Sequence, residues 1–271
     1  MPWIPSSPLI QEHTEQLYRV EIHRAGAAWT GDDATKASAK ANAATFKWSR
    51  ENGSVIFPIV GAPTVSDGTT EVTLETLGRD DRLSLAEGDW VEVQDDAYVL
   101  HNVAGKLLQI QAIDRTSMTV TLSGAPDPDV DPSRHPLLRR WDHKEGDPAE
   151  GGLQLASDGA ALIIEGSDGV WLSLEDGVQI QFQKGPPANS YNTGDYWLIP
   201  ARTATGNVEW PTEPGKDSSG NPIMVPLALP PAGIQHHYAP LALLTLSEGT
   251  ITSGPTECRK KFETLVELTP V

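Results

Sequence analysis

Apolar and polar side chains alternate with a period of two in several short segments of this chain. Successive side chains of a β-strand point to opposite faces, so this period predicts strands with one buried face. Asn52-Gly53 lies between two such segments and predicts a tight hairpin turn, because both residues tolerate a positive φ. In the first two segments the apolar members are Tyr18, Val20, Ile22, Phe46 and Trp48, and the polar members include Arg19, Glu21, His23 and Lys47.

Glycine and proline limit the length of every regular element. The 271 residues include 24 Gly and 22 Pro, well above the ~12% share that average usage gives. So many breakers favour short strands joined by turns over long helices, which predicts an all-β fold. Further strands are expected at residues 72–74, 90–93, 107–113, 118–122, 137–142, 170–174, 178–182, 195–201, 236–246 and 262–268.

The order of strands and turns suggests two β regions. Residues 83–124 show a turn, a strand, a long loop, a strand, a tight turn and a strand, which is typical of a small SH3-like barrel or a sandwich. A Pro/Asp-rich junction at 125–136 cannot hold a regular element, because proline removes hydrogen-bond donors. We therefore expect an N-terminal β domain at 1–124 and a second, antiparallel β domain at 137–271. The second domain carries long Pro/Gly-rich loops, above all at 203–233.

Residues 32–44 do not fit the strand pattern. They are rich in Ala and Lys, with acidic residues first, as the start of a helix prefers. They lack a clear apolar stripe. Two readings stay open: a short surface helix, or an inserted loop that interrupts a strand pair.

The charge balance excludes some partners. The chain has 37 Asp and Glu against 20 Lys and Arg, a formal net charge of −17. Phosphate contacts need clustered cations, so we expect no nucleic-acid binding. The longest apolar run is far below the ~20 residues of a membrane span. No signal-peptide pattern is visible at the start of the sequence, which predicts synthesis in the cytoplasm without export by that route.

Metal and cofactor motifs are weak. Cys258 is the single cysteine, so neither an internal disulfide nor a thiolate zinc site is expected. Asp127, Asp129 and Asp131 have the spacing of a calcium loop, but the glycine and glutamate that an EF-hand needs are replaced by Pro132 and Leu138. These aspartates are either a solvated acidic linker or a looser cation site. We expect no cofactor and no metal.

Motifs for catalysis are missing from the sequence. It contains no Gly-x-Ser-x-Gly elbow, no phosphate-binding loop and no dinucleotide fingerprint. A pair of carboxylates for glycoside hydrolysis stays open, because 37 acidic residues always supply candidates. We therefore name no catalytic residue and favour a protein that is not an enzyme.

Tryptophan gives the best candidates for a contact surface. The apolar face of residues 170–174 leaves Trp171 on the opposite side, with Gln179 and Gln181 on the neighbouring strand. Such a Trp among glutamines can stack on a sugar ring or pack into a partner protein. The alternative is that loop 203–233 covers this face, with Trp210 packed against it.

Several strings resemble a bacterial family of undefined function. They cover most of the chain from residue 16 to residue 246. The strings are LYRVEIH at 17–23, FKWSRENGSV at 46–55, LRRWD at 138–142, WLSLEDGV at 171–178, GDYWLIPAR at 194–202 and GIQHHYAPLA at 233–242.

The resemblance implies a role in a larger assembly. Members of that family are larger proteins with a tail-fibre-like N-terminal portion, and the chain is similar to their C-terminal half. Some members are encoded near phage-tail-like contractile injection systems. The implied function is a non-enzymatic structural or attachment component of such an assembly, which binds other proteins or a surface glycan and can form oligomers. In that role it would act within a released or surface-acting particle. The alternative is a carbohydrate-active module, either a lectin-like binder or a glycosidase.

Overall fold

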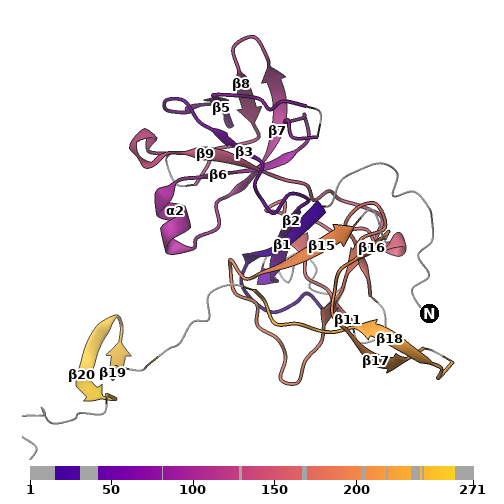
Figure 1. Cartoon of the computed structure of the whole chain (residues 1–271). Helices are drawn as coiled ribbons and strands as arrows, with labels where there is room; N and C mark the ends of the chain where they lie inside the picture. Colours follow the sequence, from indigo (N-terminus) through magenta and orange to yellow (C-terminus); the bar gives the residue numbers. More distant parts are fainter. Residues whose placement is uncertain are drawn as a thin grey trace, which may run out of the picture. The chain divides into compact units, whose positions relative to one another are not determined.

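The computed structural model describes residues 16–30, 42–80, 82–127, 130–166, 170–202, 206–217, 219–232, 239 and 241–259. The chain divides into two compact units, Met1–Ala232 and Gly233–Val271. Regular structure in the described residues is almost entirely strand, which confirms the predicted all-β fold (Figure 1). Among these residues, no helix has the length and apolar character that crossing a membrane requires.

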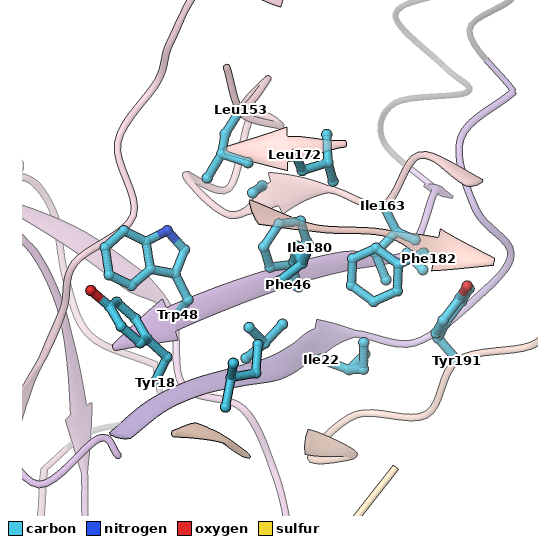
Figure 2. Close-up of a cluster of buried hydrophobic side chains, with 14 of the residues drawn as sticks. Tyr18, Ile22, Phe46, Trp48, Leu153, Ile163, Leu172, Ile180, Phe182 and Tyr191 are labelled. Carbon is cyan, nitrogen blue, oxygen red and sulfur yellow. The ribbon is translucent and has the colours of Figure 1, made fainter. Parts of the chain in front are cut away.

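A five-stranded antiparallel sheet forms one half of the first unit. Its order is β10-β2-β1-β15-β16, with the bounds β1 (Gln16–Arg24), β2 (Thr45–Ser49), β10 (Ala161–Leu162), β15 (Tyr196–Arg202) and β16 (Asn207–Val208). The predicted alternation is confirmed on β1 and β2, because their apolar side chains share one face and are buried. Phe46 lies at the centre of this core, where its ring centroid is 5.3 Å from that of Phe182 (Figure 2).

Short strands cover the apolar face of this sheet. The hairpin β12 (Leu172–Ser173) and β13 (Gln179–Ile180) buries Leu172, Val178 and Ile180, as predicted. Val170, expected on the same buried face, is 40% exposed because it lies before β12 begins. Its turn contains Asp176 at φ 49° and Gly177 at φ 81°, the left-handed geometry of a tight hairpin. The parallel pair β11 (Glu165–Gly166) and β14 (Phe182–Gln183) extends the cover.

A seven-stranded sheet forms the other half and curls into a barrel. Its order is β3-β9-β6-β7-β8-β5-β4, with the bounds β3 (Ile56–Pro58), β4 (Thr64–Ser66), β5 (Thr69–Thr73), β6 (Trp90–Gln94), β7 (Leu107–Asp114), β8 (Thr119–Leu122) and β9 (Leu137–Trp141). The residues after β3 close the curve, since Val60 N donates to Thr73 O at 2.8 Å and Glu75 N donates to Pro58 O at 3.0 Å. Inside lies a core of aliphatic side chains with Phe57.

The barrel is larger than the predicted range 83–124. That range supplies β6, β7 and β8, whereas β3, β4, β5 and β9 come from outside it. The connection between β6 and β7, expected as a loop, holds helix α2 (Asp96–His101). The Asp95 carboxylate caps this helix by accepting from the N–H groups of Ala97 and Tyr98.

The sheets divide the chain differently from the predicted domains. The split into 1–124 and 137–271 does not match the pairing, because β1 and β2 pair with β15 and β10 while β9 returns to the barrel. Pairing between strands more than a hundred residues apart leaves no local signal in the sequence. The junction 125–136 is therefore a connection within one unit. It includes the short 3-10 helix η2 (Pro132–Arg134), and a second one, η3 (Pro148–Glu150), follows β9.

Loop 203–233 contains more regular structure than expected. After β16 it forms the hairpin β17 (Thr212–Lys216) and β18 (Pro222–Pro226). A two-stranded ribbon tolerates its prolines because they lie on edge strands. Most of residues 32–44, residues 236–238 and the strand expected at 262–268 lie outside the described residues.

The second unit contains one antiparallel hairpin, β19 (Ala242–Ser247) and β20 (Thr250–Glu257). Its turn has Glu248 at φ 49° and Gly249 at φ 78°. β19 confirms the later part of the strand expected at 236–246. We call Leu241–Arg259 the terminal hairpin, since it is the described part of this unit apart from residue 239.

Candidate functional site

The polar face of β1 and β2 is buried, although it carries ionisable side chains. Glu21, His23 and Lys47 are 9%, 8% and 0% exposed. They alternate with the apolar residues of the first core, so they lie on the opposite face of the same sheet. Part of the barrel packs against this face, as the ion pair between Lys47 and Glu92 of β6 shows. Burying charges is costly unless each one finds a partner, so this face needs close pairing.

Glu92 and Lys47 form the centre of this buried face. The Lys47 Nζ lies 2.6 Å from Glu92 Oε2 and 3.4 Å from Glu21 Oε1. Trp141 Nε1 donates to Glu92 Oε2 at 2.9 Å, and Gly105 N donates to Oε1 at 2.6 Å. Lys47 Nζ also lies 4.4 Å from the centroid of the Trp141 ring. Both oxygens of Glu92 are therefore fully engaged.

Arg139 differs from the other cations beside this face. It lies opposite Glu92 in the register of β6 and β9, but that carboxylate is already engaged. Arg19 is committed too, with its Nε 2.6 Å from Glu21 Oε2 and its guanidinium 3.7 Å from the centroid of Tyr196. Within the described part of the chain Arg139 makes no ion pair, and its Nε is buried without a hydrogen bond. The charge of Arg139 is therefore not neutralised by an ion pair among the described residues, and it is available to a ligand.

Two adjoining cavities open beside these residues and form one groove. The larger, of about 410 Å³, is lined by His23, Arg24 and Asp158 among others. The smaller, of about 150 Å³, is lined by residues that include Arg19, Lys47, Gln94 and Arg139. The wall common to both is formed by Asn102, Val103, Ala104 and Thr193. We call the two together the charged groove.

Two buried histidines near the groove are neutral at pH 7. Burial lowers the pKa of His23 well below its usual value, and the Lys47 charge adds to this effect. Burial also lowers the pKa of His143 to about 4. The His143 Nε2 lies 2.9 Å from the carbonyl oxygen of Gly159, so Nε2 carries the proton and Nδ1 has none. The His143 ring stacks on Trp90 at an interplanar angle of 11°.

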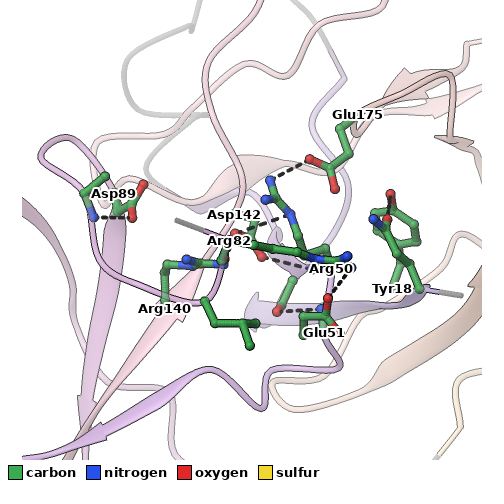
Figure 3. A network of polar contacts seen from close by, with 12 residues as sticks. Tyr18, Arg50, Glu51, Arg82, Asp89, Arg140, Asp142 and Glu175 are labelled. Atoms are coloured by element: carbon green, nitrogen blue, oxygen red, sulfur yellow. Dashed lines mark hydrogen bonds and ion pairs between the residues drawn. The ribbon is translucent and has the colours of Figure 1, made fainter. Parts of the chain in front are cut away.

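A second polar network ties three segments together (Figure 3). Arg50 N donates to Asp142 Oδ2 at 2.9 Å, and Arg50 NH2 lies 2.6 Å from Glu175 Oε2. Arg140 NH2 lies 3.2 Å from Asp142 Oδ1. Burial raises the pKa of the Glu175 carboxyl, and Arg50 opposes that shift. The network fastens the β12–β13 turn to the ends of β2 and β9, which makes it a structural feature.

The sequence profile of a family of unknown function, DUF6519, matches residues 10–268. The chain belongs to this family. The predicted membership of an uncharacterised family is thereby confirmed. No curated protein and no solved structure matches the chain.

The strings that resemble family sequences come together in this DUF6519 protein. Arg50, Asp142 and Glu175 lie in three different strings and meet in the second network. Lys47 and Trp141 also come from different strings and are in contact. These segments are therefore determinants of how the two sheets join.

Three of the predicted contact residues, Trp171, Gln179 and Gln181, share one face of the β12–β13 hairpin, whereas Trp210 lies in loop 203–233. Trp171 is half-buried, and the β12–β13 register, continued by one residue, places it opposite the half-buried Gln181. Gln179 is exposed, and its amide donates to Ser173 Oγ at 3.1 Å. Trp210 packs against the first core, and its Nε1 donates to Leu227 O at 2.8 Å. Trp210 therefore anchors its own loop.

The charged groove was missed by sequence reasoning. Lys47 and Glu92 occupy the polar positions of alternating strands, where solvent is the ordinary neighbour. Only the packing of one sheet against the other buries them. Among the described residues no group of three His, Cys, Asp or Glu side chains is placed to hold a metal ion. Asp131 caps η2 by accepting from Ser133 N, and Asp129 lies outside the described residues.

Proposed function

We propose that this protein is a non-enzymatic structural or attachment component of a phage-tail-like contractile injection assembly, which binds a protein partner through its terminal hairpin. It would be synthesised in the cytoplasm and would act within a released or surface-acting particle. The exposed aliphatic side chains of the terminal hairpin carry this proposal. The tail-like setting rests on the family resemblance of the sequence.

The terminal hairpin exposes side chains that proteins normally bury. Leu241, Leu243, Leu246 and Ile251 are 62%, 65%, 63% and 56% exposed. Burying one such side chain fully is worth about 1.5–3 kcal/mol. A two-stranded hairpin alone is marginally stable in water. A partner that covers these residues would therefore stabilise the hairpin and gain binding free energy.

The chemistry of the hairpin favours a protein partner over a glycan. Its exposed large side chains are aliphatic, whereas flat aromatic rings are the side chains that stack on sugars. Within the described part of this unit, β19 and β20 pair only with each other, so a partner strand can add to an outer edge by β-augmentation. A second copy of the chain is one such partner, so an oligomer is a further outcome of the same surface.

Sedimentation of intact particles tests the proposal. Tail-like particles are purified by ultracentrifugation from cells that express the full chain, and the chain is detected in the particle fraction. We expect the wild type to sediment with particles and the double variant Leu243→Ser/Leu246→Ser to be lost from them. Val65→Ser, an equally polar change at a 57%-exposed valine of β4, is the matched control and should sediment. Absence of the wild type from the particles would refute the proposal.

A carbohydrate-active role is the second candidate. Its supporting observation is the half-buried Trp171 with Gln181 opposite and Gln179 nearby, a ring and amides on one hairpin. A glycan array probed with wild type and Trp171→Ala tests it. Binding of a defined glycan that Trp171→Ala abolishes would favour this role, and identical profiles for the two proteins would count against it.

A further inference from the structure

The charged groove combines an unpaired cation, unpartnered polar atoms and an apolar rim. We propose that it binds a peptide segment of a partner protein, with one acidic side chain directed to Arg139 and aliphatic side chains against helix α2. This inference rests on the proposed function in that the protein works by binding proteins. It uses residues that the terminal hairpin does not contain.

The positive charge of Arg139 favours a ligand with an acidic side chain. The Arg139 side chain has no ion pair or hydrogen bond among the described residues, while Lys47 and Arg19 beside it are paired with Glu92 and Glu21. A guanidinium binds a carboxylate with two parallel hydrogen bonds, and a partly buried pair is less screened by salt than a surface pair. The smaller cavity, of about 150 Å³, has room for one such group beside Arg139.

Unpartnered polar atoms in the groove indicate that the ligand also forms hydrogen bonds. Gln94 is 7% exposed and lines the smaller cavity, and its Oε1 is buried without a hydrogen bond. His23, 8% exposed, lines the larger cavity, and its Nδ1 also lacks a partner. A buried polar atom left unpaired costs about 1–3 kcal/mol. Backbone N–H groups of a peptide, directly or through water, would satisfy the Gln94 acceptor.

The rim of the groove explains why the partner is a protein segment. Val99 and Val103 line the smaller cavity and are 63% and 53% exposed, and Leu100 beside them is 81% exposed. They form an apolar patch on α2 and its C-terminal end. A free acid or a sugar acid would leave this patch in water. An acidic residue with leucine or valine on both sides would cover it while its carboxylate reaches Arg139.

Fluorescence anisotropy with short peptides tests the inference on the full chain. The first probe is a labelled, amidated pentapeptide with glutamate at its centre and leucine or valine on both sides. The second replaces the glutamate with glutamine, and the third replaces the flanks with glycine and serine. We expect the first probe to bind about tenfold or more tightly than either of the others. Failure of the first probe to bind at millimolar concentration overturns the inference, as does equal binding of the glutamine probe.

Variants assign the binding to the groove. Arg139→Met should weaken the first probe about tenfold or more, and Arg139→Lys should keep part of the affinity. Arg115→Met is the matched control, since Arg115 is exposed in the β7–β8 turn and lines neither cavity. An equal loss in Arg139→Met and Arg115→Met overturns the inference. Glucuronate that displaces the probe at equal concentration also overturns it, because a small sugar acid would then be the ligand.

The two proposals fail separately. The double variant Leu243→Ser/Leu246→Ser should bind the first probe as the wild type does. If this variant leaves the particles while no probe binds the wild type, the groove inference falls and the hairpin proposal stands. If the probe binds through Arg139 but the chain never sediments with particles, the proposed function falls.

Discussion

The body of the protein, residues 16–232, and the terminal hairpin both carry aliphatic side chains on β-strands, but the two regions treat them in opposite ways. In the body, Val20 of β1 and Leu172 of β12 are each 2% exposed. In the hairpin, Leu243 and Leu246 of β19 are 65% and 63% exposed. An apolar strand therefore does not by itself determine what covers its side chains, because that depends on the rest of the fold. The body buries its own aliphatic side chains, and we propose that a protein partner buries those of the hairpin.

The largest effect is expected in the core of the body. Phe46→Ala removes a fully buried ring that packs against Phe182. A cavity of this kind costs about 3–5 kcal/mol of unfolding free energy. Urea unfolding followed by tryptophan fluorescence measures it, with Val65→Ala on exposed β4 as control. A loss in Phe46→Ala as small as that of the control would mean that the body does not cover itself as described.

The buried ion pair should give the next effect. Lys47→Met leaves the fully buried Glu92 carboxylate without its cation, which costs about 3 kcal/mol. Adding Glu92→Gln removes the orphaned charge, so the double variant should recover at least about 1 kcal/mol of that loss. Chemical denaturation of the two single variants and the double variant gives the coupling energy. Strictly additive losses would contradict the pairing.

The pH dependence should come partly from His143. Its folded pKa of about 4 lies below its ordinary value of 6.5, so the unfolded chain takes up a proton first as the pH falls. Stability from this residue is complete above pH 6.5 and falls by about 2 kcal/mol by pH 5. His23 acts in the same direction, and the raised pKa values of Asp89 and Glu175 act in the opposite one. Urea unfolding of the wild type and of His143→Gln above pH 6.5 and at pH 5 measures this effect. The variant should lose less unfolding free energy between these two conditions than the wild type does. An equal loss of unfolding free energy in the two proteins would mean that other residues cause the pH dependence.

The smallest effect on the body is expected from the hairpin. Leu243→Ser/Leu246→Ser changes exposed side chains and should alter the unfolding free energy of the body by no more than about 0.5 kcal/mol. Differential scanning calorimetry checks this on the full chain. A loss of several kcal/mol would show that these leucines contribute to the stability of the isolated chain, and the contrast between the two regions would disappear.

Local patterns in the sequence predicted the strands well. The alternation of β1 and β2 carries its signal within a few residues. Asn52-Gly53 forms a turn with the expected positive φ angles of 54° and 64°, but β2 and β3 on either side of it belong to different sheets and form no hairpin. The partners of the strands could not be predicted, because β1 pairs with β15 almost two hundred residues away. The charged groove could not be predicted for the same reason. No residue near Lys47 in the sequence indicates that the barrel will pack over it and place Glu92 beside it. Trp171 remains a predicted contact residue.

Hydrogen exchange of the backbone amides in the terminal hairpin tests most directly whether a protein partner covers this hairpin. Amides of β20 should exchange rapidly in the isolated chain and become protected in purified particles. Amides of β6 and β7 in the barrel should be protected in both states. Equal protection of the β20 amides in the free and the particle-bound chain would contradict the claim that a protein partner covers this hairpin.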